Sequence, residues 1–228
     1  MKQKNEPFFF YMAIVLIVIV ISGFSIVAFQ RPGGPLATPF FLHFHGAVFL
    51  SWFVLLACQA RLIGAGSYQR HRQLGFTSLG LAVAIVIIGY IVVRMTVQKP
   101  DGIIAGRPAL IGAIFPTLDI INFAVAYSLG VLNRGNANAH KRFMLIAAIM
   151  MIDAAMARLI FGLGLPGTLI IMAEFSLLLA ILAYDLFKLR RPHWATLIGM
   201  GLYIAAMRFK LNIGNVPWWP DFSRAFFG

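Results

Sequence analysis

Three acidic side chains lie well inside apolar stretches of the sequence, at Asp119, Asp153 and Glu174, and the basic side chain of Arg158 lies in the same stretch as Asp153. A carboxylate at bilayer depth costs at least ~2.5 kcal/mol on insertion scales, so it usually faces a partner or a wet cavity. Such groups bind and release protons and cations. We therefore expect these four residues to line a path for a small solute, a proton or a metal ion.

The spacing of these residues limits how they pair. Asp153 and Arg158 are five residues apart, roughly 140° around a helix axis, and so do not share a helix face. We expect Arg158 to meet Asp119 or Glu174 on a neighbouring helix instead. The alternative is that the set forms only structural ion pairs and interhelical hydrogen bonds.

Three histidines, His45, His71 and His140, are candidate ligands for haem b or a quinone. Imidazole nitrogen is a common axial ligand of haem iron. His71 and His140 each stand beside basic residues at the start of an apolar run, and His45 lies near the opposite membrane face, in register with Trp52 and Gln59. The alternative for His71 and His140 is an interfacial role, in which they cap helix starts and contact lipid phosphates.

Two of the three histidines lie in sequence motifs: His71 in His-Arg-Gln-Leu-Gly at 71–75 and His140 in His-Lys-Arg-Phe-Met at 140–144. Together with the Ala-rich stretch that ends at Arg158, they resemble a group of uncharacterised bacterial predicted membrane proteins, over the half of the chain from His45 to Arg158. The resemblance implies a helical membrane fold and no particular activity.

The motif at 71–75 also resembles, more weakly, the loop between helices in b561-type and ferric-reductase-like transmembrane cytochromes. That resemblance implies a b-type haem. Those families place haem-ligating histidines within helices, in pairs that bracket the cofactor. Here the third, fourth, sixth and seventh apolar runs have no histidine in their interiors.

The composition excludes a water-soluble surface. Of 228 residues, 61% are hydrophobic and 11% charged, with a mean hydropathy of +0.86. A soluble domain carries roughly 25% charged residues, so lipid must cover this chain. The net charge of +12 is spread between apolar runs, where anionic headgroups explain it without nucleic acid. Cys58 is the one cysteine, so no intrachain disulfide forms.

We predict an all-α, polytopic integral membrane protein, a single domain over 1–228 with about seven transmembrane helices, because each helix needs about 20 apolar residues. The predicted helices span 8–29, 39–60, 74–93, 108–132, 139–163, 168–187 and 194–210. Arg208 and Lys210 interrupt the seventh, and we expect both to extend to the headgroups. Trp218 and Trp219 follow as expected interfacial anchors.

Basic residues predict the orientation. With the N-terminus inside, eleven Lys and Arg residues, Lys2 and Lys4 among them, lie on the inner side and seven on the outer side. The positive-inside rule then places the N-terminus in the cytoplasm and the C-terminus outside, in a bacterial cytoplasmic (inner) membrane that includes anionic lipids.

The leading functional hypothesis is a redox-associated, b-type-cytochrome-like protein that binds haem or quinone through His45, His71 or His140. The alternative is a small-solute, proton or metal-ion transporter that uses the buried acids. A third possibility is an accessory subunit, joined to a membrane-complex partner or to copies of itself. The sequence has no Gly-rich phosphate loop, nucleophile elbow or His-Glu-x-x-His motif, and no catalytic residue can be identified from it.

Overall fold

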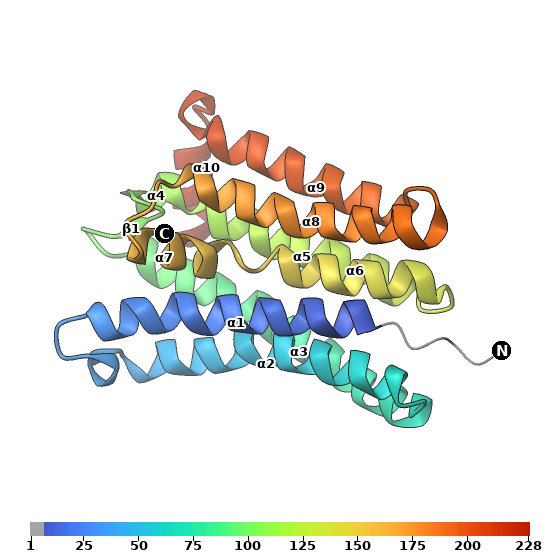
Figure 1. The fold of residues 1–228 in the computed structure, drawn as a ribbon. Helices are drawn as coiled ribbons and strands as arrows, with labels where there is room; N and C mark the ends of the chain where they lie inside the picture. Colours follow the sequence, from blue (N-terminus) through green and yellow to red (C-terminus); the bar gives the residue numbers. More distant parts are fainter. Residues whose placement is uncertain (1–6) are drawn as a thin grey trace.

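The computed structural model describes residues 7–228, and Lys2 and Lys4 lie outside this range. The chain is about 81% helical, so the all-α prediction is confirmed. Long helices run side by side, and the chain reverses direction at the loops between them except between α6 and α7, where it bends and continues (Figure 1). They are α1 (Pro7–Gln30), α2 (Phe40–Gly64), α3 (Tyr68–Val97), α5 (Ile114–Leu132), α6 (Ala137–Ile149), α7 (Asp153–Gly162), α8 (Thr168–Leu189) and α9 (Trp194–Leu211).

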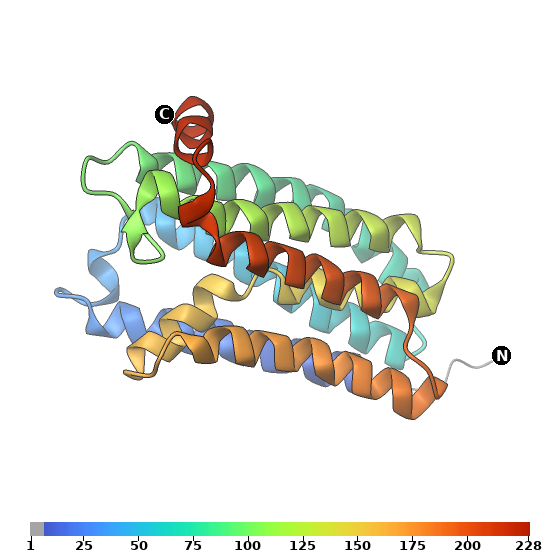
Figure 2. The ribbon, with the colours of Figure 1, turned by 90° about the horizontal axis from the view of Figure 1, so that it is seen from above.

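Short elements that the sequence did not predict gather at the end of the bundle where the C-terminus lies (Figure 1). They are η1 (Pro35–Ala37), the antiparallel pair β1 (Ile103–Ile104) and β2 (Arg107–Pro108), α4 (Ala109–Gly112), η2 (Ile213–Asn215) and α10 (Trp219–Phe227). Helix α10 lies across the bundle rather than along it (Figure 2). Trp219, expected to be an interfacial anchor, is only 3% exposed, and its indole N–H donates to the Ile111 carbonyl at 3.2 Å.

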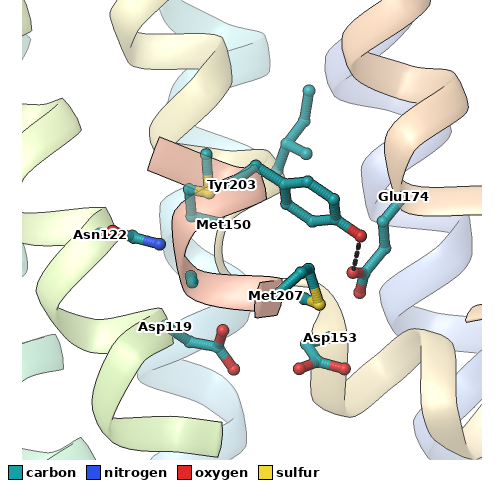
Figure 3. Close-up of a pocket in the computed structure, with 9 residues that line it drawn as sticks. Asp119, Asn122, Met150, Asp153, Glu174, Tyr203 and Met207 are labelled. Carbon is teal, nitrogen blue, oxygen red and sulfur yellow. Dashed lines mark hydrogen bonds between the residues drawn. The ribbon is translucent and has the colours of Figure 1, made fainter. Parts of the chain in front are cut away.

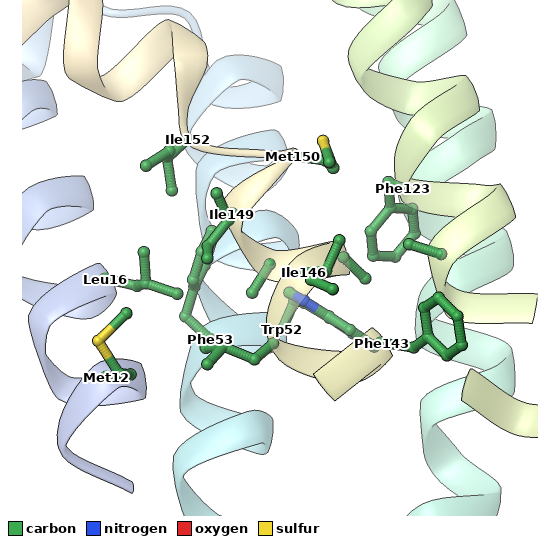
Figure 4. Packing of buried hydrophobic residues seen from close by; sticks show 14 of the residues in the cluster. Met12, Leu16, Trp52, Phe53, Phe123, Phe143, Ile146, Ile149, Met150 and Ile152 are labelled. Carbon is green, nitrogen blue, oxygen red and sulfur yellow. The ribbon is translucent and has the colours of Figure 1, made fainter. Parts of the chain in front are cut away.

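Helix α6 is the centre of the bundle. It packs against α1, α2, α5, α8 and α9, and every residue from Leu145 to Met150 is buried (Figure 4). The outer helices bury only one stripe each. In α1 the buried residues are Phe9, Met12, Ala13, Leu16, Val20 and Gly23, at the spacing of a single helix face.

Five helical segments are long and apolar enough to cross a membrane. They are α1, α2, α3, Ala109–Leu132 and α8, and the bent pair of α6 and α7 makes a sixth if it is counted as one span. Their outward faces expose large apolar side chains, among them Phe40 and Phe187, which are 83% and 84% exposed. The structure thus supports five to six of the seven predicted spans, and α9 does not meet the same criterion.

The predicted helix at 139–163 is wrong as one continuous helix. Helices α6 and α7 are separated by Met150, Met151 and Ile152, with a bend of 46° between them. At the break, the N–H groups of Met151 and Ile152 bond to carbonyls three residues back instead of four. No Gly or Pro marks the position, but Asp153 opens α7, where the positive end of the helix dipole favours a carboxylate.

Helix α3 begins six residues before its predicted start. The stretch 61–73, which lies between two predicted helices, is mostly helical, and the reversal between α2 and α3 takes only Ala65 to Ser67. His71 therefore lies in the first turn of α3.

Candidate functional site

Two of the predicted acids meet on a lysine inside the bundle. The Lys210 Nζ on α9 lies 2.5 Å from Asp119 Oδ1 on α5 and 2.5 Å from Asp153 Oδ2 on α7. The lysine side chain is fully buried, whereas the two carboxylates keep 18% and 16% exposure. The expectation that Lys210 extends to the headgroups is wrong, because two carboxylates on neighbouring helices hold it inside.

The third acid lies in the same cluster. Glu174 on α8 is 1% exposed, and its Oε2 accepts a hydrogen bond of 2.9 Å from the Tyr203 hydroxyl of α9 (Figure 3). Its Oε1 is buried and has no hydrogen-bond partner among the described residues. Glu174, Tyr203, Asp119, Asp153 and Asn122 line one small cavity. The centre of a water molecule has about 10 Å³ of free space there, enough for about one water.

Local structure explains how the acids reach this cavity. The break after α6 places Asp153 in the first turn of α7, so its carboxylate points toward α9. Pro116 lies in the first turn of α5, where a missing N–H breaks no helix hydrogen bond, and Asp119 follows one turn later. The site therefore joins the N-terminal parts of α5 and α7 to Lys210 in the last turn of α9 and to Glu174 on α8.

The charges in the cluster do not balance. Asp119, Asp153 and Glu174 face one ammonium, so full ionisation leaves two negative charges in excess. Uncompensated buried charge costs several kcal/mol per ion. The cluster therefore favours states in which its carboxyl groups hold protons, and the free Oε1 of Glu174 is available for one. The arrangement can store and release protons.

Arg158 does not join this cluster. Its Nη1 donates to the Ala154 carbonyl at 2.7 Å, and its guanidinium lies 4.7 Å from the ring centre of Phe24 on α1. The expected pairing of Arg158 with Asp119 or Glu174 is therefore wrong, and Lys210 takes that place.

The structure brings two of the three candidate histidines together. The rings of His71 and His140 have their centres 6.3 Å apart, near perpendicular to each other. The Nδ1 of His140 lies 2.8 Å from the Gly130 carbonyl oxygen, a contact that does not use its Nε2. His45 packs on Phe49 near the other end of α2, roughly 28 Å from the α2 end next to His71 at 1.5 Å per residue.

A second buried ion pair connects α6 to α8, close to the loop that leads into α9. Arg142, predicted at the inner membrane surface, is 0% exposed, and its Nε donates to Asp185 Oδ1 at 2.8 Å, while its Nη2 bonds the same oxygen. Asp185 Oδ2 accepts from the Thr196 hydroxyl at 2.6 Å and from the His193 N–H at 3.1 Å. Both carboxylate oxygens are thus used.

His193 caps α9 outside the apolar spans. Its Nδ1 accepts a hydrogen bond of 3.2 Å from the N–H of Ala195. Partial burial lowers the pKa of His193 below its ordinary value of 6.5, and the nearby positive charge of Arg142 lowers it further. The neutral imidazole is the form that can accept the capping bond.

Comparison of the chain with protein-family models, curated proteins and solved structures finds no match. Among residues 7–228, no group of three or more His, Cys, Asp or Glu side chains is arranged to hold a metal ion. A functional assignment therefore depends on the chemistry of the cluster around Lys210 and of the pair His71 and His140.

Proposed function

We propose that the chain is an integral membrane protein that carries protons, coupled to a small solute or ion, through the cluster of Asp119, Asp153, Glu174 and Lys210. One observation supports this proposal above all others. A fully buried lysine bridges two carboxylates beside a third carboxyl group with an unpartnered oxygen, inside a mostly apolar bundle. Ionisable groups at membrane depth characteristically serve ion and proton pathways.

The broken helix supports the same proposal. Transporters commonly form their binding sites where membrane helices are interrupted, because the freed helix ends provide charge and polar backbone groups. The break between α6 and α7 lies directly beside this cluster, since Asp153 and Met150 both line the cavity. A purely structural ion pair would not require an interrupted helix.

Transport is tested with the purified protein in liposomes that contain a pH-sensitive dye, with Na⁺ and K⁺ on both sides. After a pH jump, the wild-type protein should equilibrate internal pH faster than protein-free liposomes. Asp119→Asn and Asp153→Asn should lower this rate about tenfold or more, whereas Asp221→Asn, at an exposed pair, should not. Wild-type liposomes no faster than empty ones would contradict the proposal.

The exposed apolar faces support membrane insertion, and we propose that the N-terminus lies in the cytoplasm of a bacterial cell. Single cysteines in a Cys58→Ala background test this orientation. Gln98→Cys and Gly135→Cys lie at opposite ends of the bundle, and neither replaces a buried residue. In right-side-out membrane vesicles, an impermeant maleimide should label position 98 and should label position 135 only after lysis. The reverse pattern would invert the orientation.

A second candidate function is binding of a b-type haem or a quinone, favoured by the proximity of His71 and His140. Two imidazoles on opposite sides of one metal have ring centres about 6 Å apart, because each metal–nitrogen bond is about 2 Å. The observed 6.3 Å is close to that separation. The bond from His140 Nδ1 to Gly130 would orient the ring and leave Nε2 for the iron.

A visible spectrum tests this second candidate. Protein purified from haem-sufficient cells should show a Soret band, with sharper α and β bands after reduction by dithionite, and His71→Ala or His140→Ala should remove them. A flat spectrum from folded protein would rule out haem. Such a result would leave the proposed proton carrier unaffected, because the two clusters share no residue.

A further inference from the structure

The described residues form two buried ionic sites, Arg142 with Asp185 and Lys210 with Asp119 and Asp153, and these sites differ in how completely their hydrogen bonds are satisfied. Asp185 has donors on both carboxylate oxygens, and Arg142 also donates to the Asn138 carbonyl at 2.7 Å. By contrast, the two carboxylates that hold Lys210 line a cavity together with Glu174, whose Oε1 has no hydrogen-bond partner among the described residues. The first pair has the character of a permanent structural contact. The Lys210 site has free space beside its carboxylates, so another cation could bind there in place of the ammonium.

The ammonium of Lys210 occupies the position of a small bound cation. An ion at the place of Nζ would lie 2.5 Å from one oxygen of Asp119 and 2.5 Å from one oxygen of Asp153. The hard cation Ca²⁺ binds carboxylate oxygens at about 2.3–2.6 Å, and Na⁺ is of nearly the same size. The Phe115 ring, whose centre is 5.5 Å from Nζ, also favours a positive charge there. These groups would attract an alkali ion as they attract the lysine.

The occupant is further limited by size and charge. A cavity for about one water admits a dehydrated ion and excludes a larger organic solute. A monovalent ion that replaces one lysine proton leaves the total charge of the buried site unchanged.

We propose that Asp119 and Asp153 form a binding site for a monovalent alkali cation, with Lys210 as its built-in competitor. This inference rests on the proposed function and names the coupled ion. In the exchange, Lys210 releases one proton to water and becomes a neutral amine, and one alkali cation takes its place between the carboxylates. One positive charge leaves as another enters, so the exchange is balanced.

The charged and titratable groups around Lys210 come from each packed element. Asp119 faces it from α5, Asp153 from α7, Glu174 from α8 and Tyr203 from α9 itself. Helix α6 contributes only the apolar Ile149 and Met150 to the cavity. Proton release on cation binding is therefore expected from this cluster and from no histidine.

Proton release from the wild-type protein in detergent tests the inference directly. Addition of NaCl, KCl or LiCl to a weakly buffered solution near pH 8.5 should release up to one proton per chain, and choline chloride should release none. The apparent dissociation constant should fall about tenfold for each unit rise in pH while one proton is exchanged per ion. No release with any alkali salt, beyond that with choline, would overturn the inference.

A variant separates competition from a general salt effect. Lys210→Met removes the competing ammonium and leaves Asp119 and Asp153 without a positive partner. The thermal unfolding midpoint of this variant should therefore fall in choline chloride, and it should recover to a saturating value as an alkali salt is added. Arg142→Met is the matched control, since it removes the other buried cation and should show no such recovery. Equal recovery in both variants would show that the site is not specific.

The two proposals can fail separately. Alkali-dependent proton release in detergent, without faster pH equilibration in liposomes, would retain the cation site and reject transport. Faster pH equilibration that is equal in choline and in alkali salts, without proton release, would retain the proton carrier and reject the alkali cation.

Discussion

Gly23 on α1 lies directly against the backbone of Ala155 on α7: a Cβ at position 23 would stand 2.1 Å from the Ala155 carbonyl oxygen. The contact joins the first helix to α7, the second half of the broken helix. Since the neighbour is backbone, no side-chain rotation can relieve the overlap, and the two helices would have to separate.

Gly23→Ala should therefore lower the free energy of unfolding by about 1–3 kcal/mol, the usual range for overpacking. Thermal unfolding in detergent would measure it. Gly80→Ala on α3 is the matched control, because a Cβ there meets nothing within 4 Å and the better helix propensity of Ala should leave stability equal or up to about 1 kcal/mol higher. Equal effects at both positions would refute the close contact.

Asp185→Ala should be strongly destabilising, by about 3–5 kcal/mol, because it leaves the buried guanidinium of Arg142 without its partner. Asp221→Ala removes a carboxylate from an ion pair whose side chains are 65% and 81% exposed, and should cost less than about 1 kcal/mol. Unfolding by denaturant in mixed micelles compares the two. A small loss at Asp185 would mean that Arg142 reaches water.

Acid should weaken the cap of α9. Because the pKa of His193 is lowered in the folded protein, the unfolded chain takes up this proton first. The contribution of neutral His193 to the free energy of unfolding is thus fully present above pH 6.5, and it is lost as the pH falls from 6.5 through the lowered pKa of the folded protein. His193→Asn keeps a capping acceptor that does not titrate.

The thermal unfolding midpoint of the wild type, followed from pH 7.5 to pH 5, should fall more steeply than that of His193→Asn. Parallel curves for the two proteins would show that protonation of His193 does not disturb the cap.

Tyr203→Phe should slow proton movement without a large change in the fold. The variant removes the hydroxyl that donates to Glu174 Oε2. A hydrogen bond to a charged group is worth about 1.5–3 kcal/mol, so the ionised form of Glu174 becomes about tenfold or more rarer. Dye-loaded liposomes that contain this variant should show a comparable fall in the rate at which the internal pH equilibrates. Tyr127→Phe, whose hydroxyl bonds Ser78 elsewhere, should retain the wild-type rate.

Much of the fold was predictable because apolar runs of membrane length are a strong local signal. The predicted range 168–187 became Thr168–Leu189, and 8–29 became Pro7–Gln30. The break at Met150 to Ile152 was not predictable, since it lacks Gly or Pro and depends on how α7 packs against α1 and α8. Local sequence does not contain that packing.

The site was predictable in part. The three acids were recognised as buried, but their partner was assigned to Arg158 because Lys210 stands near a helix end, where lysines usually reach the headgroups. Its partners are 57 and 91 residues away along the chain. One local signal was present: Lys210 follows Tyr203 by seven residues and so shares its helix face.

The interruption between α6 and α7 also has a mechanical consequence. A continuous helix transmits torque along its axis through its regular hydrogen bonds. At Met151 and Ile152 this regular pattern is interrupted, because both N–H groups bond to carbonyls three residues back. Helix α7 is coupled chiefly to α1, whereas α6 is coupled to α5 and α9. A twist imposed on α7 therefore ends at the joint, and α6, which contains Arg142, keeps its orientation.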